Sequence, residues 1–216
     1  MSTAKEQALT VSSELLEKGL LELNLPLGKE QQGLLLQYLA LLDKWNQVYN
    51  LTAIRDLTKM VKSHLLDSLS VVPLLTGERV LDVGSGAGLP GIPIAVAKPE
   101  WEMTLLDSNH KKAAFLRQAV TELSLNNAHV VCERIESWDA PKGFEVIISR
   151  AFSDLGEFVS LAGRLLAQGG VIAAMKGLHP FEELERLPPG FRIKEVRALQ
   201  VPGLGAERHL VLIERV

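Results

Sequence analysis

The sequence predicts an α/β fold in which a Rossmann-like, mostly parallel sheet follows a helical extension. An apolar strand pattern leads into a glycine-rich loop and a helix over residues 79–97, and strand and helix patterns then alternate to residue 176. The strand patterns at 191–199 and 209–214 are joined by a loop without a helix, so they should pair antiparallel. We therefore expect a seven-stranded sheet whose last strand is antiparallel.

Composition limits the classes of function. The 216 residues include 23 basic and 26 acidic side chains, and the net charge of −3 argues against indiscriminate coating of nucleic acid, although a local basic face is compatible with it. Cys132 is the only cysteine, so no intramolecular disulfide can form. The first residues show no apolar signal core, and no apolar run approaches the ~20 residues that cross a bilayer. We expect a cytoplasmic protein without membrane contact, and a monomer.

Residues 1–75 are predicted to form the helical extension and residues 76–216 the sheet domain. Apolar residues recur at helical spacing over 6–23 and 29–46, which predicts two amphipathic helices that pack on the main domain. Asp56 is placed to cap a third helix that carries Lys59, Lys62 and His64.

The loop over residues 45–56 is rich in side chains that can bind a ligand. It combines two aromatic rings with amides and an arginine, including Asn50 and Arg55. Such groups can stack on and hydrogen-bond to unpaired RNA bases, and they can equally pin an ordinary loop. His64 in the next helix has three possible roles, as a general base, a phosphate contact or a packed side chain.

The glycine loop is compatible with two kinds of cofactor. Asp82-x-Gly84-x-Gly86-x-Gly88 resembles the first motif of S-adenosylmethionine-dependent methyltransferases. The segment 86–91 also fits the dinucleotide fingerprint G-x-G-x-x-G, with Asp107 at the place of a ribose-binding acid. Because a carboxylate at Asp82 would repel a pyrophosphate and attract the cationic methionine end of S-adenosylmethionine, we favour the methyl donor. A ligand-free structural turn is the third alternative.

Further candidates follow the ends of later strands. Asp107 ends the second strand, where its carboxylate can accept both ribose hydroxyls or cap the helix near Asn109. Because ligands of doubly wound sheets bind beyond the carboxyl ends of the strands, the tails with Ile135, Glu136 and Arg150 should share one crevice with the glycine loop. The helix over 109–123 presents a basic surface that includes Lys111 and Lys112. Cys132 is predicted to be packed inside a strand.

These motifs together resemble the bacterial ribosomal RNA small-subunit methyltransferase G family, formerly called glucose-inhibited division protein B. The resemblance covers most of the chain and is more specific than the glycine loop alone. It is carried by Lys44-Trp45-Asn46 to Thr52, His64-Leu65-Leu66-Asp67-Ser68-Leu69, Gly84 to Gly91, Leu106-Asp107-Ser108 with Lys111-Lys112, Ser149-Arg150-Ala151-Phe152 and Met175-Lys176-Gly177.

The resemblance implies a class I methyltransferase fold and a 16S ribosomal RNA guanine-N7 methyltransferase that acts on the 530 loop, with S-adenosylmethionine as donor and small-subunit ribosomal RNA or the small subunit as partner. Its pattern places Gly84, Leu89, Ile135, Glu136 and Arg150 in the cofactor pocket, and physical reasoning adds Asp82, Gly86 and Asp107. Arg150 and Asn50 are the candidates for positioning the reaction. The candidates for RNA contact are Arg55, His64, Lys111, Lys112 and Lys176.

No metal ion is expected, and guanine N7 needs no general base because it carries a lone pair and no proton. Alternatives of other classes are a nicotinamide-dependent oxidoreductase, a noncatalytic RNA-binding assembly factor, and a methyltransferase of proteins or small molecules, since a fold does not identify the acceptor.

Overall fold

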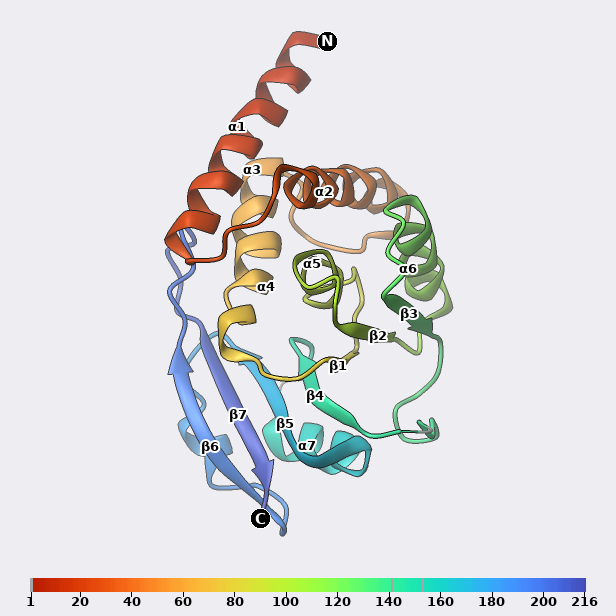
Figure 1. Ribbon diagram of the computed structural model, residues 1–216, viewed down its shortest axis with the longest axis vertical. Coiled ribbons are helices and arrows are strands. Elements are labelled where there is room, and N and C mark those ends of the chain that lie inside the picture. The colour runs from red at the N-terminus through yellow and green to blue at the C-terminus, as the bar shows by residue number, and fades with distance from the viewer. Residues whose placement is uncertain (1, 141, 153) are drawn as a thin grey trace.

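The computed structural model describes residues 2–140, 142–152 and 154–216, and for residues 2–6 it describes the backbone only. Seven strands form one sheet in the order β3-β2-β1-β4-β5-β7-β6 (Figure 1). Strand β7 is antiparallel to both of its neighbours, and the other paired strands are parallel. The strands are β1 (Arg79–Val83), β2 (Glu102–Leu106), β3 (Ala128–Val131), β4 (Phe144–Ser149), β5 (Leu166–Lys176), β6 (Phe191–Ala198) and β7 (His209–Arg215). The predicted fold class, with its antiparallel last strand, is confirmed.

Helices cover both faces of the sheet (Figure 1). Alternate side chains of a strand point to opposite faces, and in β4 Val146 and Ile148 join one buried cluster while Ile147 joins the other. The first cluster lies under the N-terminal helices and the helices Gly91–Ala97 and His110–Glu122, and the second lies under the helix Leu155–Ala162. The helices are α1 (Ser2–Glu22), α2 (Lys29–Tyr49), α3 (Leu57–Met60), α4 (Asp67–Leu69), α5 (Gly91–Ala97), α6 (His110–Glu122), α7 (Leu155–Ala162) and α8 (Phe181–Leu184), with a π-helical turn (Val61–Leu66) between α3 and α4 and short 3₁₀ turns at Val72–Leu74 and Gly163–Leu165.

The N-terminal helices share a core with the sheet. Leu16, Leu35 and Tyr38 are buried in the same cluster as Leu105 and Met103 of β2. The Tyr38 hydroxyl also donates a hydrogen bond of 2.5 Å to the carbonyl of Ala87 in the glycine loop. The extension therefore supports the loop directly, while the division of the chain at residue 75 stays a prediction.

Two predicted boundaries differ from the structure. Strand β3 ends at Val131, so Cys132 lies just beyond it, half-buried, with its Sγ atom 3.3 Å from Nδ1 of His110. The prediction that Cys132 is packed inside a strand was wrong, because the chain leaves the sheet one residue earlier. Strand β5 begins at Leu166, five residues before the apolar run that identified it. No helix in the described part of the chain is both long and apolar enough to span a bilayer.

Candidate functional site

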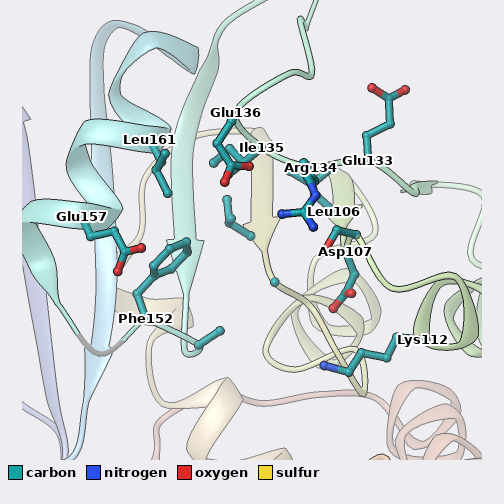
Figure 2. A pocket seen from close by; sticks show the side chains of 14 residues that line it. Leu106, Asp107, Lys112, Glu133, Arg134, Ile135, Glu136, Phe152, Glu157 and Leu161 are labelled. Carbon is teal, nitrogen blue, oxygen red and sulfur yellow. The ribbon is translucent and has the colours of Figure 1, made fainter.

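A hollow of about 320 Å³ opens beyond the carboxyl ends of β1, β2 and β4, and we call it the Asp107 hollow. In Figure 2, the Phe152 ring, Leu161 and Ile135 lie on one side of it, and Asp107 and Lys112 lie on the other. An apolar wall facing a carboxylate suits a nucleoside, which combines a flat base with ribose hydroxyls. The hollow is lined by Val83, Gly84, Leu106, Asp107, Ser108, Lys112, Glu133, Arg134, Ile135, Glu136, Ala151, Phe152, Glu157 and Leu161.

The glycine loop contributes Gly84 to the lining of this hollow and of a second hollow described below. Gly84, Gly86 and Gly88 have φ angles of +70°, +57° and +87°, a region that residues with a Cβ rarely adopt. A Cβ at Gly84 would lie 3.0 Å from the Cβ of Ala151. The amide of Gly84 donates to the carbonyl of Leu106 over 2.8 Å, which fixes the loop to the end of β2. The loop is therefore held in place at the end of β2, and the space beside Gly84 stays open because glycine has no side chain.

Asp107 fixes the same loop from the side. Its Oδ2 accepts a 2.9 Å hydrogen bond from the amide of Gly86, and its Oδ1 accepts one of 2.8 Å from the amide of Asn109. An ionised carboxylate has about four acceptor positions, so Asp107 retains capacity for two hydroxyls. The capping role considered for Asp107 belongs to Asn109, whose side chain accepts from the amides of Lys111 and Lys112.

Asp82 lies beneath the loop. It is completely buried and lines none of the hollows described here, and its Oδ2 accepts a 3.0 Å hydrogen bond from the amide of Gly91 at the start of α5. Its Oδ1 has no hydrogen-bond partner among the described residues. Burial raises the pKa of Asp82 to about 7, although the Gly91 amide opposes this shift. The structure thus assigns Asp82 to holding the loop and α5 together, and its contact with a bound cation stays a prediction.

The raised pKa makes a testable prediction for Asp82→Asn. The folded protein binds the Asp82 proton more tightly than the unfolded chain, so stability that is present below about pH 4 is lost as the pH rises through about 7. From pH 5 to pH 8 we expect the free energy of unfolding of the wild type to fall by about 3 kcal/mol relative to the variant. Urea unfolding of both proteins across this range measures the difference, and parallel curves would contradict the assignment.

A second hollow, of about 180 Å³, is lined largely by the glycine loop, and we call it the Gly86 hollow. It shares Gly84 and Ala151 with the Asp107 hollow, so the two hollows are adjacent. The remaining lining residues are Leu51, Thr52, Ser85, Gly86, Ala87, Leu89 and Arg150.

A third hollow, of about 390 Å³, shares Arg150 with the second, and we call it the Arg208 hollow. His64 lines it but is buried, with Nε2 2.9 Å from Oγ1 of Thr52. Burial, and then the Arg150 charge, lower the pKa of His64 to about 4, so its ring is neutral at pH 7 and offers no cation to a phosphate. Its lining consists of Ile54, Ser63, His64, Asp67, Arg150, Met175, Lys176, Gly177 and Arg208.

The predicted site residues separate into groups. The hollows bring together Gly84, Gly86, Leu89, Asp107, Ile135, Glu136 and Arg150, all predicted for the cofactor, together with His64 and Lys176. Lys112, predicted for RNA, lines the Asp107 hollow instead, and Lys111 is exposed outside it. Asn50 and Arg55 lie outside these linings, where Nη2 of Arg55 donates to Oδ1 of Asn50 over 3.1 Å.

Sequence reasoning missed two charged residues of the site. Asp67 is almost completely buried, and its carboxylate binds both Arg150 and Arg208. Asp67 lies within a motif quoted for the family resemblance, but nothing near it in the sequence marks its partners. Arg208 precedes β7 in a segment without a motif. No group of three or more potential metal ligands occurs among the residues that the structure describes.

Comparisons with known proteins identify a family. The family model described as rRNA small subunit methyltransferase G matches residues 31–211. The chain is 57% identical over 198 residues to the ribosomal RNA small subunit methyltransferase G of Laribacter hongkongensis, covering 92% of this chain and 96% of the relative. It is 52% identical to that of Nitrosospira multiformis, covering 93% of this chain and 96% of the relative.

Solved structures share the fold at lower identity. TrmN from Thermus thermophilus superposes with a TM-score of 0.52 at 19% identity, over 80% of this chain and 52% of that one. The tRNA (uracil-54, C5)-methyltransferase of Pyrococcus abyssi was solved in complex with S-adenosyl-L-homocysteine. It has a TM-score of 0.51 at 24% identity, over 68% of this chain and 37% of that one. These likenesses show the methyltransferase fold.

Proposed function

Because the chain belongs to the rRNA small subunit methyltransferase G family, we propose that it transfers a methyl group from S-adenosylmethionine to N7 of one guanine in the 530 loop of small-subunit ribosomal RNA. Family membership makes the chain a methyltransferase of ribosomal RNA. The proposal adds the finer assignments, which are the guanine base, its N7 atom and the 530 loop. These finer assignments rest on the family resemblance. The observation that supports methyl transfer at this site is the row of three adjacent hollows, which share Gly84, Ala151 and Arg150 and offer space for a donor beside an acceptor.

The described residues fit the donor. The apolar wall of Ile135, Phe152 and Leu161 suits adenine, and the Asp107 carboxylate suits the ribose hydroxyls. The Gly86 hollow would receive the methionine end. The donor would pass close to the backbone of Gly84, where a Cβ would obstruct it. When bound, the donor supplies an electrophilic methyl group on a sulfonium.

The reaction needs no side chain that removes a proton. Guanine N7 carries an in-plane lone pair and no proton, so the protein has to align this atom with the methyl group and exclude water. His64 is consistent with this, because burial lowers its pKa to about 4, which makes the ring a weak base, and its Nε2 lies 2.9 Å from Oγ1 of Thr52. Alignment of reacting groups can supply a large part of the rate enhancement. Arg150, which borders both the Gly86 and the Arg208 hollow, is the side chain best placed to maintain it.

The test is transfer of labelled methyl from S-adenosylmethionine to small ribosomal subunits purified from cells that lack this protein. We expect label in N7-methylguanosine of the 530 loop, found by mapping the modified nucleoside. Subunits from cells that contain the protein are the control and should accept little label, since their site is already methylated. Naked ribosomal RNA, tested in parallel, shows whether the assembled subunit is required.

Two outcomes would contradict the proposal. Label in another nucleoside would overturn the N7 assignment, and no label despite tight donor binding would overturn the ribosomal acceptor. A thermal-shift comparison of NAD with S-adenosylmethionine tests the dinucleotide alternative, since a ligand that binds only the folded state stabilises it by an amount that grows with ligand concentration relative to Kd. We expect a shift with S-adenosylmethionine only.

A further inference from the structure

Building on the proposed function, we propose that the Arg208 hollow receives the target nucleotide of the RNA, that Arg208 binds a phosphate at its mouth, and that Asp67 is a positioning residue that orients Arg150 and Arg208. The hollow of about 390 Å³ lies within the range typical of ligand pockets. It borders the Gly86 hollow at Arg150, which lines both, so a nucleotide in one hollow would lie beside a donor in the other.

The cluster is built around one buried carboxylate. Oδ1 of Asp67 accepts a 2.9 Å hydrogen bond from Nε of Arg208, and Oδ2 accepts one of 3.1 Å from Nη1 of Arg150. The side chain of Asp67 is 1% exposed, whereas those of Arg208 and Arg150 are 25% and 29% exposed. Asp67 therefore holds the two guanidinium groups from inside, and both keep surface that a ligand can reach.

The cluster carries surplus positive charge. Two guanidinium groups share one carboxylate, and the Nη2 group of each arginine has no acceptor among the described residues. The other basic residues add little, because Lys176 is paired with Glu183 at 2.6 Å and His64 is neutral. Free N–H groups of an oriented guanidinium match the oxygen atoms of a phosphate. An anionic ligand such as the RNA backbone is thus the expected occupant.

The segment that follows Gly177, which we call the rim, favours an unpaired strand as the ligand. Gly177 lines the hollow, and beyond it in the sequence Leu178 and Phe181 are 75% and 72% exposed, with the ring centroids of His179 and Phe181 3.9 Å apart. Proteins that bind single-stranded nucleic acid combine a basic groove with aromatic rings on which bases stack. The Arg208 hollow and this rim have the same combination.

Arg208→Ala tests the phosphate contact. We expect KM for small subunits to rise about tenfold, and the slope of log affinity against log salt concentration to become less steep by about 0.7 to 1, since one phosphate contact is lost. The affinity for S-adenosylhomocysteine should stay unchanged. Arg208→Lys keeps the charge without the fork of donors, so it should restore the salt slope and only part of KM.

The matched control is Arg192→Ala, which removes the same charge. Arg192 is paired with Glu214 near the end of β7, so it lies at the opposite end of the strands from Arg208. If wild-type protein methylates the guanine while Arg208→Ala matches Arg192→Ala in KM and salt slope, the phosphate contact is overturned and the proposed function stands. If wild-type protein transfers no methyl group to the guanine, the proposed function itself fails.

Asp67→Asn separates positioning from simple attraction. The substitution raises the net charge by one, so attraction alone would leave KM unchanged or lower it. A positioning role predicts instead that kcat falls at least about tenfold, because Arg150 and Arg208 lose their shared anchor, while donor affinity is kept. Unchanged kcat in the folded variant would overturn this role. If Asp67→Asn does not fold, Arg208→Lys decides it, since unchanged kcat and KM there would show that orientation is unimportant.

Discussion

Gly84→Asp is expected to abolish binding of S-adenosylmethionine, with an affinity loss of at least about 100-fold, or ~3 kcal/mol. The φ angle of +70° is strained for any residue with a Cβ, and the new Cβ would lie 3.0 Å from that of Ala151, where the Asp107 and Gly86 hollows meet. The added carboxylate would also occupy the space meant for the ligand. Isothermal titration with S-adenosylmethionine measures the loss directly.

Gly169→Asp is the matched control for this substitution. Gly169 has nearly the same backbone strain, with φ at +74°, but no atom lies within 4 Å of its added Cβ. It is exposed in β5, at the end of the strand away from Lys176. We expect a similar loss of thermal stability and an unchanged donor affinity. Donor binding by Gly84→Asp as tight as that of wild type would contradict the position of the donor in these hollows.

The parts of the fold that sequence predicted are those encoded by neighbouring residues. Strands β1 and β4 begin and end where their apolar runs do, and the antiparallel β7 follows from a loop too short for a crossover helix. The amphipathic face of α2 was also visible in the sequence. Its spacing did not show that Tyr38 would reach the glycine loop and bind the carbonyl of Ala87, because periodicity identifies a buried face and not its partner.

The site was predictable where motifs carried it and unpredictable where distant residues meet. The glycine loop and Asp107 were predicted because their residue types and spacing are typical of a nucleoside site, and Arg150 was predicted from the family resemblance. The pairing of Asp67 with Arg208 joins residues 141 positions apart, and no local pattern encodes it. The depth of Asp82 beneath the loop is likewise a result of packing, which is why its chemistry suggested ligand contact while the structure shows it bound to the Gly91 amide.

Arg150→Ala is expected to lower the rate of methyl transfer by about 10² to 10³, the range seen when one positioned donor is removed from an active site. Arg150 borders both the Gly86 and Arg208 hollows, so its loss would open a passage for water and release the alignment of donor and acceptor. Single-turnover transfer to small subunits measures this rate without the contribution of product release.

The fold should survive Arg150→Ala because Asp67 would keep its 2.9 Å hydrogen bond with Arg208 and so would not become an unpaired buried charge. We expect a modest fall in Tm and less than about a tenfold change in donor affinity, since Arg150 lines only the Gly86 hollow of the two that would hold the donor, and the Asp107 hollow, which would hold the adenosine, does not include it. Arg150→Lys keeps the charge but replaces the planar guanidinium, whose Nη1 donates to both Asp67 and the carbonyl of Ser63, so it should recover only part of the rate. Full activity in Arg150→Ala, equal to that of Arg192→Ala, would show that Arg150 does not position the reaction.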